Sequence, residues 1–238
     1  MNDFFIRGVK IATEDLAGYP FSIPAIRGAE TISFTSPVTF FVGENGTGKS
    51  TLIEAIAVAA GFNAEGGTKN YNFSSYDTIS PLAQSLTLVR GPRREKRGYF
   101  LRAESFYTTA NYTEKGTFPT DGSPAPLLVD GKRLHEQSHG EAFMSIIHEF
   151  EPGLFILDEP ESALSPRTII TLIQIIQKLT NRGTQFIIAT HSPILLAIPG
   201  AKIYQFSQRG LWTVAYENVD HVKITREFLH NPEKYIGA

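Results

Sequence analysis

The stretch VTFFVGENGTGKSTLIEAIAVAA, residues 38–60, decides the fold, because an apolar run, a glycine-rich turn and a helix-forming run follow one another directly. Val38 to Val42 is short and wholly apolar, as a buried strand is. Lys49 to Ala60 contains strong helix formers and stops before Gly61. The sequence therefore predicts a strand, a loop and a helix in this order.

The loop reads GENGTGKS and fits the pattern G-x-x-x-x-G-K-S. Its glycines let backbone N–H groups curl around a phosphate, and the helix N-terminus adds a positive dipole. In this pattern the lysine, Lys49, reaches the β- and γ-phosphates, and the Ser50 hydroxyl binds Mg²⁺. The alternative is a glycine-rich turn that binds nothing. The context favours a nucleotide site made of Gly43, Glu44, Asn45, Gly46, Thr47, Gly48, Lys49, Ser50 and Thr51.

A second stretch, LFILDEPESALSP (residues 154–166), has two adjacent carboxylates at the end of an apolar run. Buried carboxylates are costly unless a positive group lies near them, and the phosphate-binding loop supplies one. Asp158 is then placed to face Mg²⁺. Glu159 is placed to accept a proton from the attacking water, or to orient it. The alternative is an N-cap aspartate followed by a solvated glutamate.

His191 is the third candidate. It follows the apolar run QFIIAT and precedes SPILL. A lone histidine is more often structural than catalytic, but ligands collect at the carboxyl ends of strands in open α/β sheets. We therefore expect His191, between Thr190 and Ser192, to contact the γ-phosphate.

The rest of the chain indicates an α/β fold with an additional antiparallel β region. After a helix expected over about 138–150, short apolar runs alternate with helical ones, which implies a mostly parallel sheet covered on both faces. The expected strands here are 154–157, 185–189 and 202–206, with a helix over 168–179 and a strand and an amphipathic helix near the C-terminus. Strands are also expected at 4–11, 19–26, 31–34, 85–90 and 99–103, the last two joined by a basic turn.

Composition sets the remaining limits. The 238 residues carry a net charge of −2 and no cysteine, which excludes disulfides and thiolate metal sites. The length suits one substantial domain, or one domain with a subsidiary lobe. Because the N-terminus makes a poor signal peptide and no long apolar run follows, we expect a soluble, cytoplasmic chain without a membrane segment of its own.

Taken together, these motifs resemble the ATP-binding-cassette (ABC) class of ATPases. GENGTGKS resembles the Walker A motif, LFILDEP the Walker B motif with its catalytic glutamate, SALSP the D-loop, and His191 the switch histidine. In EQSHGEAF (residues 136–143), Ser138, Gly140 and Glu141 match an LSGGQ-type signature motif, although His139 and Gln137 depart from it. A serine N-cap with a capping box explains the same segment equally well.

The resemblance implies Mg²⁺-dependent ATP hydrolysis with Lys49, Glu159 and His191 as catalytic residues. It also implies an ATP-dependent, head-to-tail homodimer, in which the signature motif of one subunit closes over the ATP of the other. The chain is then a single ABC-type ATPase domain, with a nucleotide-binding lobe at about 1–104 and 151–238 and a helical signature lobe at about 105–150.

Two departures from transporter ATPases matter. Arg102 and Glu104 stand where a glutamine is expected, and Glu104 could take over its metal or water contact. Glu161 stands where a transporter usually has threonine. DEPESALSP and ATHSPILL therefore resemble the soluble branch of the class (RecF, SMC and OLD-like ATPases, and compact stand-alone "AAA family" ATPases) more than transporter subunits. Tyr19 and Phe21 are candidates for stacking on adenine.

The basic turn RGPRREKRG, with five basic residues between Arg90 and Arg97, is either a solvated hairpin tip or a patch that contacts DNA or RNA phosphates. Three functions therefore compete. The first is a soluble ATPase in nucleic-acid maintenance, defence or a toxin–antitoxin-like system, with nucleic acid or a protein as partner. The second is the ATP-binding subunit of a membrane transporter. The third, a non-enzymatic nucleotide switch, is disfavoured because both Lys49 and Glu159 are present.

Overall fold

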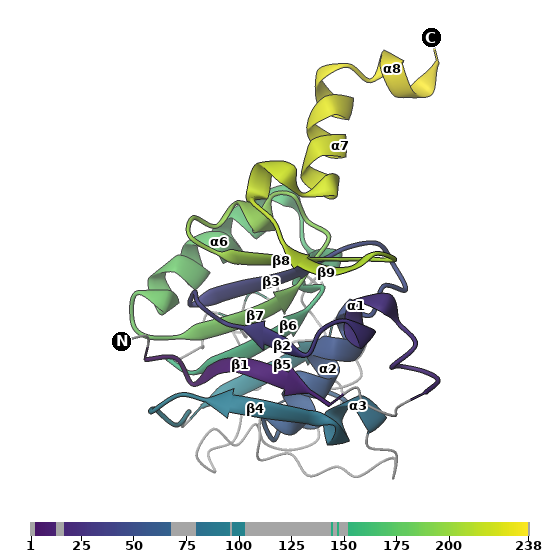
Figure 1. Ribbon diagram of the computed structural model, residues 1–238. Coiled ribbons are helices and arrows are strands. Elements are labelled where there is room, and N and C mark those ends of the chain that lie inside the picture. The colour runs from purple at the N-terminus through teal and green to yellow at the C-terminus, as the bar shows by residue number, and fades with distance from the viewer. Residues whose placement is uncertain are drawn as a thin grey trace.

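The computed structural model describes residues 3–12, 17–67, 80–95, 97–102, 144, 147 and 152–237, which form two β-sheets and several helices (Figure 1). The strands are β1 (Ile6–Ile11), β2 (Thr31–Ser33), β3 (Val38–Val42), β4 (Leu86–Arg90), β5 (Gly98–Arg102), β6 (Leu154–Asp158), β7 (Gln185–Ala189), β8 (Lys202–Ser207) and β9 (Gly210–Thr213). The helices are α1 (Pro24–Arg27), α2 (Lys49–Ala59), α3 (Pro81–Gln84), α6 (Pro166–Thr180), α7 (Asp220–His230) and α8 (Glu233–Ile236). Short 3₁₀ turns lie at Pro160–Ala163, Leu195–Ala197 and Tyr216–Asn218.

The larger sheet is the scaffold for the candidate site. Its strands lie in the order β5-β6-β7-β3-β8-β9. All neighbours are parallel except β8 and β9, which pair antiparallel. Strands β3, β6 and β7 are buried along their whole length, as expected when both faces of a sheet are covered. The predicted mostly parallel sheet is confirmed.

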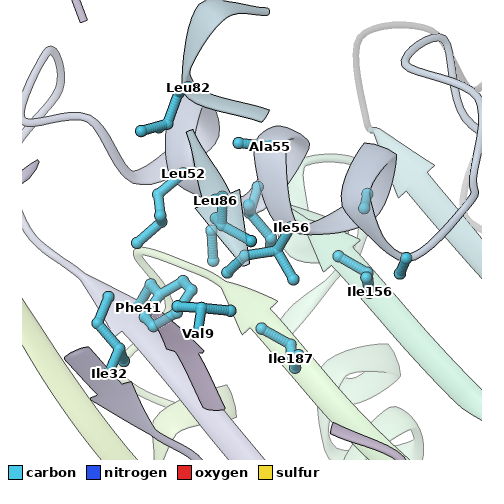
Figure 2. Close-up of a cluster of buried hydrophobic side chains, with 14 of the residues drawn as sticks. Val9, Ile32, Phe41, Leu52, Ala55, Ile56, Leu82, Leu86, Ile156 and Ile187 are labelled. Carbon is cyan, nitrogen blue, oxygen red and sulfur yellow. The ribbon is translucent and has the colours of Figure 1, made fainter. Parts of the chain in front are cut away.

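A hydrophobic core lies on each face of this sheet. Phe41 of β3 belongs to the core that contains Leu52 and Ile56 of α2 (Figure 2). Its neighbour Phe40 belongs to the other core, with Leu172 of α6. Adjacent residues of a strand point to opposite faces, so a single apolar run can serve both cores.

The smaller sheet, β2-β1-β4, is antiparallel and covers α2 on the side away from the larger sheet (Figure 1). Val9 and Leu86 of this sheet share the core around α2 (Figure 2). A buried amide joins the two sheets: Gln185 Oε1 accepts a hydrogen bond from the N–H of Ile6 at 3.0 Å, and Gln185 Nε2 donates to the C=O of Ile6 at 2.7 Å. Helix α2 is therefore enclosed between two sheets, which explains its apolar composition.

The strand expected at 19–26 is wrong. This segment forms turns followed by α1, which begins at Pro24. Pro20 and Pro24 have no N–H to donate to a strand ladder, whereas proline fits the first position of a helix.

The strands on either side of the basic turn do not form a hairpin. Strand β4 pairs with β1 in the smaller sheet, and β5 pairs in parallel with β6 in the larger one. The turn is therefore a crossover between two sheets. The burial of the two strands differs accordingly: Tyr99, Phe100 and Leu101 of β5 are all buried, but only Leu86 of β4 is.

The predicted helical lobe, 105–150, lies outside the described residues except for Met144 and Ile147. These two are helical and buried in the core on the α6 face of the larger sheet. The division into two lobes stays a prediction. At the other end of the chain, α7 and α8 extend away from the sheets (Figure 1). Among the described helices, none combines the length and the apolar character needed to span a bilayer.

Candidate nucleotide site

The GENGTGKS loop joins the end of β3 to the start of α2. Gly43, Gly46 and Gly48 have positive φ values of 148°, 76° and 98°, a region that residues with a Cβ rarely adopt. A Cβ on Gly43 would lie 2.4 Å from the carbonyl oxygen of Phe206 on β8. Because Gly48 is the N-cap of α2, the free N–H groups of the first helical turn lie at the loop, where an anion can bind.

Lys49 is buried, with 4% of its surface exposed, and its Nζ donates a hydrogen bond to the backbone carbonyl of Glu44 at 3.0 Å. Burial lowers the pKa of Lys49, while the nearby carboxylates of Glu159 and Asp158 raise it. The site therefore surrounds one buried cation with carboxylates from the end of β6.

Ser50 and Asp158 meet across the loop and the sheet, and Ser50 Oγ donates a hydrogen bond to Asp158 Oδ1 at 3.2 Å. Burial raises the pKa of Asp158 to about 6, although the hydrogen bond from Ser50 and the charge of Arg102 lower it. Hydroxyl and carboxylate oxygens are the hard donors that suit Mg²⁺, which usually takes only one or two carboxylates from a protein. The predicted donor pair therefore fits this ion.

Glu159 has a left-handed backbone, with φ 51° and ψ 51°, and it is the only non-glycine residue with positive φ in the described part of the chain. Its N–H donates to the carbonyl of Ala189, the last residue of β7, at 2.9 Å. Glu159 Oε1 lies 3.3 Å from His191 Nε2. Such uncommon backbone geometry is concentrated at functional sites.

The His191 ring lies beside this carboxylate. Nε2 is buried and makes no hydrogen bond to any described residue. Burial lowers the pKa of His191, and the charges of Lys49 and His221 also lower it. Buried polar atoms are usually hydrogen-bonded, so this unpaired nitrogen is a candidate contact for a ligand.

Two neighbours of His191 were not predicted as site residues. Glu161 Oε1 accepts a hydrogen bond from the His191 N–H at 2.6 Å. The ring of His221, on α7, stacks on the His191 ring with centroids 5.1 Å apart. The only signal for Glu161 was its departure from the transporter pattern, and nothing in the sequence around His221 marks it.

The residues in place of the expected glutamine are only partly described. Arg102 Nη1 donates to Glu54 Oε2 of α2 at 2.8 Å, and Arg102 is the register partner of Asp158. Arg102 therefore lies next to the carboxylate site, bonded to α2. Glu104 lies outside the described residues.

The two aromatic candidates for adenine stacking differ in exposure. Phe21 is 6% exposed and lies in the core around α2, so it has no free face for a base. Tyr19 is 72% exposed, and its hydroxyl lies 2.9 Å from Thr51 Oγ1 at the phosphate loop. Tyr19 is the better placed of the two.

The signature residues Ser138, Gly140 and Glu141 lie outside the described residues. In the basic turn, Arg90 pairs with Glu95 at 3.2 Å, and the Arg93 guanidinium lies 5.0 Å from the centre of the Phe5 ring. At least these two cations make contacts within the chain, which weakens the case for the turn as a nucleic-acid patch.

Comparison with known proteins finds family models that match two parts of the chain. Residues 20–110 match a family model described as "AAA domain", and residues 142–197 match one described as "AAA domain, putative AbiEii toxin, Type IV TA system". The cobalt import ATP-binding protein CbiO of Salmonella typhimurium is 23% identical over 249 residues, covering 95% of this chain and 91% of that protein. The phosphate import ATP-binding protein PstB 1 of Vibrio vulnificus is 30% identical over 182 residues, covering 65% and 64%.

Among solved structures, a putative metal-chelate type ABC transporter in an inward-facing conformation superposes with a TM-score of 0.51 at 14% identity, covering 97% of this chain and 90% of that one. The same α/β fold is therefore present. The chain is an ABC-type P-loop ATPase. For this ABC-type ATPase, the predictions of the fold class, the family and ATP hydrolysis are confirmed. The roles of individual site residues stay predictions.

Proposed function

We propose that this ABC-type ATPase hydrolyses ATP with Glu159 as the residue that orients the attacking water and accepts its proton. The observation that carries the proposal is the Glu159–His191 pair, 3.3 Å apart, at the same strand ends as the Ser50–Asp158 pair. A carboxylate that accepts a proton must lie within reach of the water, and the left-handed backbone of Glu159 turns it out of the strand towards His191.

The other residues bind and orient the nucleotide. The backbone N–H groups of the loop and the Lys49 ammonium would hold the β- and γ-phosphates, and His191 Nε2 would contact the γ-phosphate. Ser50 and Asp158 would hold Mg²⁺, which neutralises charge on the phosphate oxygens. Tyr19 is the proposed contact for the adenine base.

We further propose that ATP drives head-to-tail dimerisation, with Ser138, Gly140 and Glu141 of a second copy closing over the nucleotide. The openness of the site supports this. The side chains of Glu159 and His191 are 37% and 31% exposed, so the γ-phosphate end is not enclosed by the described residues. Closing an active site expels bulk water and prevents side reactions, and a second subunit would close this one.

The system that we favour is a soluble one, in nucleic-acid maintenance, defence or a toxin–antitoxin-like pair. The match of residues 142–197 to a model described as "AAA domain, putative AbiEii toxin, Type IV TA system" supports it, as does Glu161 in DEPESALSP. A specific observation also favours the alternative, an ATP-binding subunit of a transporter: the likeness to CbiO extends over nearly the whole of both chains.

The test of the mechanism is Glu159→Gln, with Glu30→Gln as a matched control on an exposed residue outside the site. Glu159→Gln should lower kcat by about 100-fold or more, since general-base catalysis contributes on this scale. It should also form a dimer with Mg²⁺ and ATP in light scattering after gel filtration. Normal hydrolysis by Glu159→Gln would reject the role of Glu159, and a monomer under all conditions would reject the dimer.

A second measurement separates the candidate systems. ATPase activity that is stimulated by DNA or RNA and weakens with rising salt supports the nucleic-acid reading, because phosphate contacts release counterions. Co-purification with a membrane-spanning partner instead supports the transporter reading.

A further inference from the structure

The backbone at His221 is held by contacts with the sheet, although α7 as a whole extends away from the two sheets (Figure 1). It is the second residue of α7. Before it, the Asp220 side chain accepts a hydrogen bond from Gln205 Nε2 on β8. After it, Val222 is 3% exposed and belongs to the core on the α6 face of the sheet. Contacts of both neighbouring residues therefore hold the backbone at His221 in place.

This ring lies between the phosphate loop and the switch histidine. It stacks on His191, with centroids 5.1 Å apart and planes inclined by 25°. Its Nε2 lies 3.5 Å from Glu44 Oε1 in the loop. Because His191 Nε2 lies 3.3 Å from Glu159, four side chains from four segments of the chain form one row: Glu44, His221, His191 and Glu159.

Of the two contacts that His221 makes in this row, the ion pair with Glu44 and the stack on His191, the stack is the more important for function. Glu44 is 80% exposed on its side chain, and an ion pair with so exposed a partner contributes little to stability. The stacked pair is different, because a flat ring packed on one face of His191 restricts rotation of that ring. The stack fixes the plane of the His191 ring, and this plane sets the directions in which its ring nitrogens can meet a phosphate.

We propose that His221 is a positioning residue for His191: by stacking, it holds the His191 ring with Nε2 at the γ-phosphate position, and it connects α7 to the nucleotide site. This inference rests on the role proposed above for His191. It assigns a function to the first turn of α7, which no motif in the sequence marks.

The test compares variants that keep or remove the ring. His221→Leu and His221→Ala remove the stack, His221→Phe keeps it, and His230→Leu, on an exposed histidine at the other end of α7, is the matched control. A misoriented catalytic group costs rate more than binding, so the two variants without a ring should lose about tenfold in kcat with an almost unchanged KM for ATP. His221→Phe should recover most of that loss, and His230→Leu should match the wild type.

ATP binding can be measured separately. Trp212, the single tryptophan of the chain, lines a cavity of about 730 Å³ together with Glu44 and His221, so its fluorescence can report nucleotide at the loop. Only a variant that unfolds cooperatively at the melting temperature of the wild type is used for the comparison of kinetics. The His221 side chain is already 16% exposed, so both His221→Leu and His221→Ala should fold.

Three outcomes are decisive. Loss of kcat without a ring and recovery with phenylalanine support the proposal. Wild-type kcat in His221→Leu and His221→Ala overturns it, and so does an equal loss in His221→Phe. If the proposed function were wrong, Glu159→Gln would hydrolyse ATP at the normal rate. The His221 variants do not measure this, so the two failures are distinguishable.

Discussion

The Glu161 carboxylate accepts a 2.6 Å hydrogen bond from the backbone N–H of His191, 30 residues further along the chain. The bond joins the 3₁₀ turn after β6 to the loop after β7, the two segments that carry Glu159 and His191. The second oxygen of Glu161, Oε2, is also buried. This hydrogen bond therefore adds a second contact between the two proposed catalytic segments, besides the bond from the Glu159 N–H to the carbonyl of Ala189.

Replacing Glu161 with alanine should leave the His191 N–H without its acceptor. We expect a loss of about 1–3 kcal/mol in the free energy of unfolding and a fall in kcat of about tenfold as the loop shifts. Urea unfolding and steady-state kinetics measure the two effects. Glu161→Gln keeps the acceptor oxygen, so it should unfold and hydrolyse ATP like the wild type; an equal loss in both variants would contradict a role for the hydrogen bond.

Asp158 predicts a pH dependence of stability in the absence of nucleotide and Mg²⁺. Burial raises its pKa from 3.8 in the unfolded chain to about 6 in the folded one. Below about pH 4 both states hold the proton, and above about pH 6 the folded state must bury a charge. A difference of about two pKa units corresponds to a fall of about 3 kcal/mol in the free energy of unfolding as the pH rises through this window.

The variant Asp158→Asn removes this ionisation and keeps an oxygen for Ser50. Its free energy of unfolding should exceed that of the wild type at neutral pH and equal it near pH 4, as measured by urea unfolding across the pH range. Some pH dependence should persist in the variant, because burial also raises the pKa of Glu161. Equal stability of variant and wild type at neutral pH would show that Asp158 is not penalised by burial.

Ser50 should control the requirement for magnesium. In Ser50→Ala the hydroxyl that donates to Asp158 Oδ1 is absent, so one proposed Mg²⁺ ligand is lost. The concentration of Mg²⁺ that gives half-maximal ATPase activity should rise by about tenfold or more, since outer and inner metal contacts each affect affinity on that scale. Ser50→Thr keeps the hydroxyl and serves as the control. An unchanged Mg²⁺ titration in Ser50→Ala would remove Ser50 from the metal site.

Gln185 should matter for folding although it is remote from the chemistry. Its amide forms both hydrogen bonds that join Ile6 to the larger sheet, at 3.0 Å and 2.7 Å. Gln185→Leu leaves two buried backbone groups of β1 unpaired, at a cost of about 1–3 kcal/mol each. The midpoint of urea unfolding should fall accordingly, whereas Gln174→Leu, at an exposed position of α6, should leave it unchanged. A wild-type midpoint for Gln185→Leu would mean that the two sheets are held together by apolar packing.

The glycines of the phosphate loop should differ in their tolerance of a methyl group. Gly43→Ala places a Cβ 2.4 Å from the Phe206 carbonyl, while Gly46→Ala meets nothing within 4 Å. Both positions have positive φ, which alanine rarely adopts, so both variants should lose stability, and Gly43→Ala should lose more because of the clash. Thermal unfolding of the pair measures it. Equal melting temperatures would show that β8 moves away at no cost.

The main elements could be predicted from the sequence because their signals are local. The bounds of β3 and β7 agree with the predicted strands at 38–42 and 185–189, since both are short, wholly apolar runs. The strand predicted at 19–26 was wrong because Pro20 and Pro24 have no N–H groups for hydrogen bonds to a neighbouring strand. The hairpin expected from β4 and β5 was wrong, because the partners of a strand depend on which face it buries, and this is a property of the whole fold.

The sequence by itself determined the strand, loop and helix of the nucleotide site and the carboxylates at the end of β6. These follow from residue type and spacing, through the φ freedom of glycine, the free N–H groups of a helix start and the end of an apolar run. Only the tertiary structure decided that Glu161 binds the backbone of His191, that His221 stacks on its ring, and that Gln185 joins the two sheets. Each of these contacts connects residues 30 or more positions apart. The first two exist because the order β6-β7-β3-β8 brings separate strand ends to one edge of the larger sheet, and the third exists because β1 of the smaller sheet lies beside the start of β7.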